Sequence, residues 1–123
     1  MTEIEESHKN LVANLVKPGG VIKGQLTPLQ AHLWHMVSGV AGEAGELLDA
    51  IKKHVVYQKD LDLENVIEEL GDLEFYMEGV RQALNLERGV ILKANYDKLN
   101  KRYSSGKYSD QAAQERADKQ DGQ

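Results

Sequence analysis

Apolar positions recur with helical spacing along most of the chain. From Pro28 to about residue 56 they return every three or four residues, which predicts one long amphipathic helix. Thr27 and Pro28 favour a helix start, because a threonine side chain caps free N–H groups and proline fits the first helical position. The apolar stripe of this helix consists of Leu29, Leu33, Met36, Val37, Val40, Ala44, Leu47, Leu48, Ile51 and Val55.

Three further segments show the same periodicity. Residues 3–16 predict a helix ahead of the long one. Asp62 is a suitable N-cap for a helix that runs to Leu84, and a turn at 85–87 separates it from a helix over 88–102. Strand-like alternation occurs nowhere over a useful length of the sequence. The pattern therefore predicts the all-α class, arranged as a four- to five-helix bundle.

Breaker residues and composition set the boundaries between these segments. Residues 17–20 read Lys-Pro-Gly-Gly and interrupt the helical pattern, which predicts a loop. From Ser104 onward the chain is polar and offers almost nothing to bury, which predicts a loose tail with one helical turn after Asp110. The expected organisation is an N-terminal helix at 1–17, a loop at 18–27, the main helical domain at 28–103 and a polar, flexible tail at 104–123.

The composition excludes several classes of protein. The 123 residues suit one domain, and the absence of cysteine excludes disulfides, thiolate metal sites and cysteine nucleophiles. Lys and Arg number 15 against 20 Asp and Glu, and the net charge of −5 argues against binding polymeric nucleic acid. The acidic N-terminus lacks the apolar region of a secretion signal, and no stretch approaches the roughly 18 apolar residues of a membrane span. We therefore expect a cytoplasmic protein with no membrane contact.

Two acidic motifs repeat at an offset of 26 residues. The pattern Val-x-x-Glu-x-Gly-acid-Leu begins at Val40 and again at Val66. Its acidic residues are Glu43, Glu46, Glu69 and Asp72. At about 100° per residue, each acidic pair lies beside the apolar stripe of its helix. If the two helices pack antiparallel by their stripes, all four carboxylates converge at one seam.

Four converging carboxylates need a positive partner, because like charges a few ångströms apart repel one another. Carboxylate oxygens are the ligands that Mg²⁺ and Mn²⁺ prefer, so the repeat predicts a divalent metal site. The alternative is that these acids belong to solvated helix faces. Gly45 and Gly71 lie between the paired acids, where each costs roughly 0.5–1 kcal/mol relative to alanine. We expect close helix approach, or the approach of a ligand to the backbone, to offset that cost.

Several residues outside the repeat are candidates for substrate contact. The amide of Asn95 and the cations of Lys98 and Arg102 share one helix face and suit phosphate oxygens, although such a stripe can also be a solvated helix end. Trp34 is either a core residue or a platform on which a base stacks. The remaining candidates are Lys101 and Lys53 for phosphate and His35 for a hydrogen bond to substrate.

The motifs resemble those of a known family. Glu43-x-x-Glu46, followed by Glu68-Glu69-Leu70-Gly71-Asp72, is similar to the signature of the MazG-like, all-α nucleoside triphosphate pyrophosphohydrolases. The stretch Asn95-x-x-Lys98-x-x-Lys101-Arg102-Tyr103 resembles the substrate-binding last helix of that family. The resemblance covers about residues 28–103.

The resemblance implies an assembly and a reaction. Family members are helical bundles that form dimers or tetramers, so a homodimer or homotetramer is expected. They convert a nucleoside triphosphate to the monophosphate and pyrophosphate with Mg²⁺, for which Mn²⁺ is a candidate substitute, and a role in nucleotide pool control follows. By this resemblance Glu43, Glu46, Glu69 and Asp72 would hold metal, Glu69 or Glu68 would activate water, and Asn95, Lys98 and Arg102 would hold phosphate or sugar. The alternatives are a phosphoribosyl-ATP-type pyrophosphohydrolase and a non-catalytic, metal-binding helical module.

Overall fold

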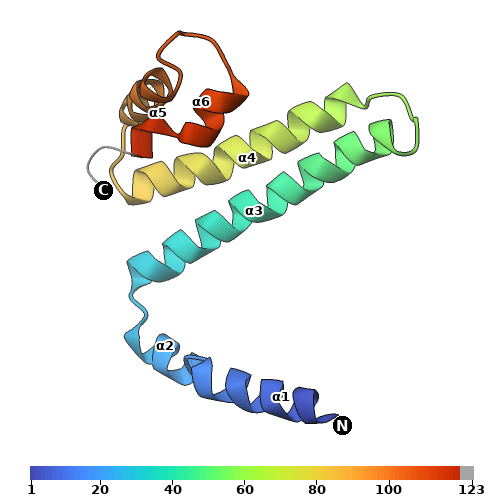
Figure 1. Ribbon diagram of the computed structural model, residues 1–123, viewed down its shortest axis with the longest axis vertical. Coiled ribbons are helices and arrows are strands. Elements are labelled where there is room, and N and C mark those ends of the chain that lie inside the picture. Colours follow the sequence, from blue (N-terminus) through green and yellow to red (C-terminus); the bar gives the residue numbers. More distant parts are fainter. Residues whose placement is uncertain (120–123) are drawn as a thin grey trace. The chain divides into compact units, whose positions relative to one another are not determined.

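The computed structural model describes residues 1–119, and no strand occurs within that range (Figure 1). This confirms the predicted all-α class. No helix among the described residues is long and apolar enough to cross a membrane. The elements are α1 (Glu3–Leu15), α2 (Gly19–Gln25), α3 (Pro28–Val55), α4 (Leu63–Ala83), α5 (Arg88–Arg102), α6 (Asp110–Glu115) and a 3₁₀ turn η1 (Ala117–Lys119).

Side-chain caps fix where the main helices begin. At the start of α3 the Thr27 hydroxyl accepts a hydrogen bond from the Gln30 N–H at 3.1 Å, and the Gln30 side chain accepts one from the Thr27 N–H at 2.9 Å. At the start of α4, Asp62 Oδ1 accepts a hydrogen bond from the Asn65 N–H at 3.1 Å. Both caps satisfy N–H groups that have no partner inside the helix. The predicted starts of these two helices are therefore confirmed.

The loop predicted at 18–27 is wrong, because α2 occupies most of it. Pro18 precedes the first helical residue, and its carbonyl accepts hydrogen bonds from the N–H groups of Val21 and Ile22 at 3.1 and 3.2 Å. A proline at a helix start loses no hydrogen bond, since its position needs no N–H. The glycines that follow disfavour a helix by about 1 kcal/mol each, which weakens it without excluding it.

The chain divides into two compact units, residues 1–35 and residues 36 onward, and the division falls within α3. In the second unit α3 and α4 run antiparallel and side by side (Figure 1). Two glycines set their approach, because the Tyr76 ring lies against Gly39 and the Met36 sulfur lies against Gly79, each in the space that a Cβ atom would take. Met36 and Ala50 are the buried apolar residues of the described part of the chain.

Replacing Gly39 with alanine should lower the free energy of unfolding, although alanine is the better helix former. The added methyl group would overlap the Tyr76 ring, and overpacking of this kind typically costs about 1–3 kcal/mol. Gly42→Ala is the matched control, since a Cβ at Gly42 meets nothing within 4 Å in this chain. Urea unfolding of both variants measures the difference. Equal stability of the two variants would contradict the close approach at Gly39.

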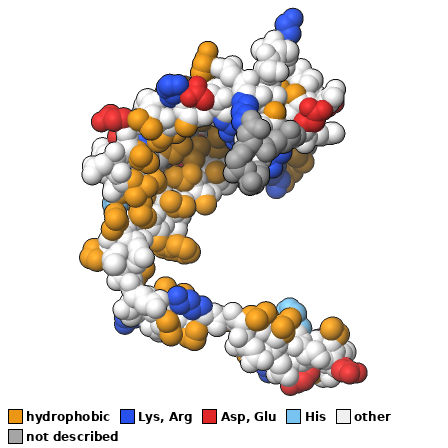
Figure 2. Space-filling model, turned by 60° about the vertical axis from the view of Figure 1, so that its left-hand side comes forward, with side chains coloured by type: hydrophobic (Ala, Val, Ile, Leu, Met, Phe, Trp, Pro, Cys, Tyr) orange, Lys and Arg blue, Asp and Glu red, His pale blue; other side chains and the backbone are white. Residues whose placement is uncertain are grey.

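Much of the apolar surface of α3 and α4 stays uncovered within one chain. Leu48 is 70% exposed, Ile67 is 62% exposed and Phe75 is 66% exposed. Figure 2 shows hydrophobic side chains gathered over a broad surface of the second unit. Large apolar side chains are usually buried in folded proteins, so their exposure here is unusual.

The C-terminal segment is anchored, which contradicts the prediction of a loose tail. The helical turn predicted after Asp110 is α6, where the Ser109 hydroxyl accepts a hydrogen bond from the Ala112 N–H at 3.1 Å. Beyond α6, Asp118 pairs with Arg102 at 2.7 Å. The pair joins residues 16 positions apart, a separation that carries no local sequence signal. The last part of the predicted tail, residues 120–123, lies outside the described residues.

Candidate metal centre

Three of the predicted acids meet where α3 and α4 lie side by side. Glu43 comes from α3, while Glu69 and Asp72 come from α4 and are three residues apart on one face. Each offers a carboxylate oxygen, and these atoms lie within 4.8 Å of one another. The antiparallel packing of the two helices thus brings both copies of the acidic repeat together.

The Glu69 carboxyl group occupies an unfavourable place for a negative charge. Glu69 is half-buried, and its Oε2 atom is shielded from solvent without a hydrogen-bond partner. Hydrogen bonding to the Glu43 carboxyl raises the pKa of Glu69 to about 7, and burial and the charges of Glu43, Glu46 and Asp72 act in the same direction. Near neutral pH, Glu69 is therefore partly protonated, and a cation could take the place of this proton.

A hard divalent cation fits this arrangement. The donors are carboxylate oxygens, which Mg²⁺ and Mn²⁺ prefer over nitrogen or sulfur. The covered oxygen of Glu69 lacks a partner, and a buried acceptor of this kind is costly unless something positive reaches it. A cation bound by Glu43, Glu69 and Asp72 would neutralise their mutual repulsion and take the place of the proton that Glu69 holds.

The other two acidic candidates lie next to this trio. Glu46 is close enough for its charge to raise the pKa of Glu69, but it is not among the three residues whose oxygens lie within 4.8 Å. Glu68 precedes Glu69 on α4 and is exposed. The structure thus brings three of the four predicted metal ligands together. Metal binding by Glu46 and a catalytic role for Glu68 stay predictions.

The two glycines of the acidic motifs do not serve helix packing within the chain. A Cβ atom added at Gly45 or at Gly71 would meet nothing within 4 Å. The expected close helix approach at these positions is therefore wrong for α3 and α4, whose close contacts fall at Gly39 and Gly79 instead. The approach of a ligand to the backbone beside the acids stays a prediction.

The candidate phosphate-binding residues of α5 differ in accessibility. Asn95, Lys98 and Lys101 are exposed. Arg102 is engaged, since its Nε donates a hydrogen bond to Asp118 Oδ1 at 2.7 Å and its Nη2 donates one to Oδ2 at 3.3 Å. The sequence did not predict this contact, because Arg102 and Asp118 are 16 positions apart. Lys53 on α3 also has an acidic neighbour, because its Nζ lies 3.1 Å from Asp49 Oδ2 in an exposed pair.

Trp34 and His35 lie on the part of α3 that belongs to the first unit, and both are exposed. Trp34 is 77% exposed, so the alternative that it is a core residue is wrong within this chain. Trp34 borders an apolar groove of about 540 Å³, whose lining residues are Ile22, Leu26, Gln30, Ala31 and Trp34. A contact of Trp34 or His35 with substrate stays a prediction.

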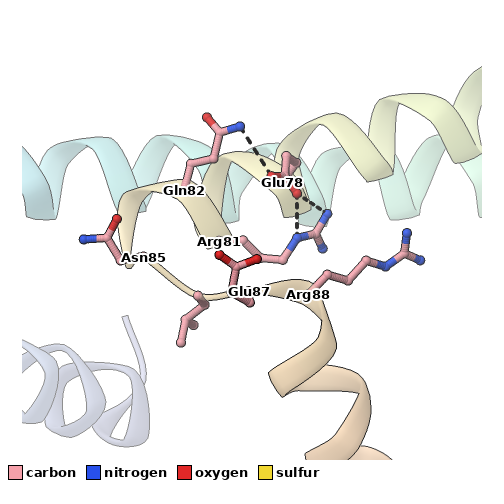
Figure 3. Close-up of a pocket in the computed structure, with 7 residues that line it drawn as sticks. Glu78, Arg81, Gln82, Asn85, Glu87 and Arg88 are labelled. Atoms are coloured by element: carbon pink, nitrogen blue, oxygen red, sulfur yellow. Dashed lines mark hydrogen bonds and ion pairs between the residues drawn. The ribbon is translucent and has the colours of Figure 1, made fainter.

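A polar pocket of about 400 Å³ lies at the corner between α4 and α5 (Figure 3). Arg81 donates a hydrogen bond from Nε to Glu78 at 2.7 Å, and this contact lowers the pKa of Glu78. Arg81 and Arg88 also lie 3.8 and 3.7 Å from Glu74. Glu78, Arg81 and Arg88 thus lie in ion pairs at this corner, and none of the three belongs to the acidic cluster. We interpret the pocket as a structural corner that fixes the turn between the two helices.

Comparison with known families identifies the class of the chain. The model of the MazG nucleotide pyrophosphohydrolase domain matches residues 32–105, which is more than half of the sequence. The chain therefore belongs to the MazG nucleotide pyrophosphohydrolase family, as the motifs led us to expect. The matched range contains both acidic motifs and the basic face of α5. No curated protein and no solved structure matches the chain.

Proposed function

We propose that this chain hydrolyses a nucleoside triphosphate to the monophosphate and pyrophosphate, using Mg²⁺ held by Glu43, Glu69 and Asp72. The observation that carries the proposal is the meeting of these three carboxylates, one of which, Glu69, has a covered oxygen, Oε2, without a hydrogen-bond partner. Membership of the MazG family supports the reaction class. When bound, such a cation polarises phosphoryl oxygens and lowers the pKa of a coordinated water. Mn²⁺ is proposed as a substitute, because its ligand preference is the same.

The remaining roles follow from charge and position. Glu46 is proposed as a further metal ligand, and Glu69 or the exposed Glu68 as the group that orients or deprotonates the attacking water. The cations of Lys98, Lys101, Arg102 and Lys53, with the amide of Asn95, are proposed to hold phosphate or sugar and to stabilise charge on the leaving group. Trp34 is proposed to stack on the base, and His35 is proposed to form a hydrogen bond with the substrate. A cytoplasmic role in nucleotide pool control stays part of the proposal.

The products of the reaction test this function. Incubation with Mg²⁺ and a panel of ribonucleoside and deoxyribonucleoside triphosphates, followed by ion-exchange separation, should yield monophosphate and pyrophosphate. Phosphoribosyl-ATP in the same panel tests the alternative substrate. A diphosphate with orthophosphate as the main products would exclude this reaction class, and the absence of turnover with every substrate would favour a non-catalytic metal-binding module.

We further propose that the chain assembles as a homodimer or homotetramer. The support is the exposed apolar surface of α3 and α4, where burial would contribute about 25 cal/mol per Å². Symmetric self-association is the common way to cover such a surface. Sedimentation equilibrium at micromolar concentration should give twice or four times the mass of the chain. A monomer at that concentration would contradict the assembly.

A further inference from the structure

The segment from Ser109 to Lys119, which we call the C-terminal strap, folds back against the end of α5. Both α6 and η1 contact α5, and Figure 1 shows α6 beside it. Near the end of the strap lies Asp118, whose two carboxylate oxygens accept hydrogen bonds from Nε and Nη2 of Arg102. The Asp118 side chain is only 5% exposed and that of Arg102 is 16% exposed. The pair is thus a forked contact largely withdrawn from solvent.

Among the described residues, the side chains that the strap partly buries are few and mostly small. The half-buried residues of the strap are three alanines and Asp118, and alanine buries little apolar area. Helix α6 has six residues, and a helix of that length is unstable without outside contacts. Arg116, which links α6 to η1, has a φ of 50°, in the left-handed region that disfavours residues with a Cβ atom. The forked pair between Asp118 and Arg102 therefore helps to hold the docked strap against α5.

A carboxylate seated on a guanidinium in this way occupies the donors that a phosphate would use. Two N–H groups of an arginine match two oxygens of a carboxylate or of a phosphate with the same fork. We propose that Asp118 is an intramolecular competitor for anions at Arg102, and that the C-terminal strap covers this residue until a polyphosphate displaces it. The assignment of substrate phosphate to Arg102 rests on the proposed function, whereas the competition itself rests on the contact described above.

A polyphosphate has the chemistry to displace the strap. Asp118 offers one negative charge, whereas pyrophosphate offers several charged oxygens on two linked groups. Lys98 lies one turn before Arg102 on the same face of α5 and is exposed, so it can add a second contact to an incoming phosphate. The strap would thus yield to a polyphosphate more readily than to a singly charged anion.

Asp118→Asn tests the competition, with Asp110→Asn as the matched control. Both substitutions remove one negative charge from the strap, but Asp110 bonds to the Tyr108 hydroxyl rather than to Arg102. The measurement is calorimetric binding of inorganic pyrophosphate without metal. Asp118→Asn should bind pyrophosphate about three- to tenfold more tightly than the wild-type protein, and Asp110→Asn should bind it with unchanged affinity. Equal or weaker binding by Asp118→Asn would overturn the proposal.

Limited trypsin digestion gives a second readout, whose main arm uses the wild-type protein alone. Arg116 is already exposed, but trypsin needs a locally unfolded backbone to cleave. Release of the strap should loosen this backbone, so pyrophosphate should accelerate cleavage after Arg116 several-fold. Mass spectrometry of the products measures the cleavage. Arg102→Gln should abolish this acceleration. Unchanged or slower cleavage at Arg116 when pyrophosphate is added would overturn the proposal that a polyphosphate displaces the strap.

These measurements separate the strap from the proposed function. If Asp118→Asn binds pyrophosphate more tightly but the protein hydrolyses no triphosphate, the competition at Arg102 is supported and the proposed enzymatic function is contradicted. The opposite result is also informative. If the protein hydrolyses triphosphate, but the wild-type protein and Asp118→Asn bind pyrophosphate equally, the proposed enzymatic function is supported and the proposed competition at Arg102 is overturned.

Discussion

Glu69→Gln should lower kcat/KM for triphosphate hydrolysis by at least about a hundredfold, which corresponds to roughly 2.7 kcal/mol of lost transition-state stabilisation. The amide keeps the size of the side chain but removes the negative charge from the centre of the cluster with Glu43 and Asp72. Both a metal ligand and a candidate group for water activation are lost at once. Initial rates at saturating Mg²⁺ measure the effect.

Glu64→Gln is the matched control for this variant. Glu64 lies in the first turn of the same helix, is exposed and stands outside the cluster. The same chemical change there should leave kcat/KM within about twofold, since the effect of a single exposed charge is small. Circular dichroism shows whether both variants keep their helices. If Glu69→Gln is as active as the control, the Glu69 carboxylate has no role in catalysis.

The stabilisation of the protein by Mg²⁺ should depend on pH because of the same residue. The pKa of Glu69 is about 7 in the native state against 4.5 for the ordinary side chain, so the native state holds a proton that the unfolded state has released between these values. Stability without metal should therefore fall as pH rises from about 4.5 to about 7. Mg²⁺ must displace this proton, so it should raise the melting temperature more at pH 8 than at pH 5.5.

The size of this stabilisation follows from mass action. A ligand that binds only the native state at ten times its Kd contributes about 1.4 kcal/mol, which is roughly 5 °C for a chain of this size. Melting curves at one protein concentration, with and without Mg²⁺ at both pH values, measure it. Glu69→Gln should flatten both the metal response and the pH dependence. A melting temperature that Mg²⁺ leaves unchanged at pH 8 would contradict a metal centre.

The features that the sequence predicted correctly depend on neighbours along the chain. The apolar period and the caps at Thr27 and Asp62 are local, so they located α3 and α4 within one residue at each end. The acidic repeat placed Glu43 and Glu69 in equivalent helical positions. Antiparallel packing by the apolar stripes then sufficed to bring them together.

The features that were missed depend on partners distant in sequence. The pair between Arg102 and Asp118 and the contact of Tyr76 with Gly39 arise only when segments fold back on one another. A glycine that admits an aromatic ring and a glycine that faces open space look alike in a sequence. For the same reason, the sequence of α5 could not indicate that Arg102 is already paired with Asp118.

The scarcity of buried apolar side chains within one chain has a kinetic consequence. Single helices form in less than a microsecond or so, and docking of the neighbouring helices α3 and α4 closes only a short connection. In the proposed assembly, Leu48, Ile67 and Phe75 find cover only when two chains meet. The last step of folding is then second order in protein concentration. Dilution prolongs the time during which these surfaces lie open to unintended partners, while helix formation proceeds at an unchanged rate.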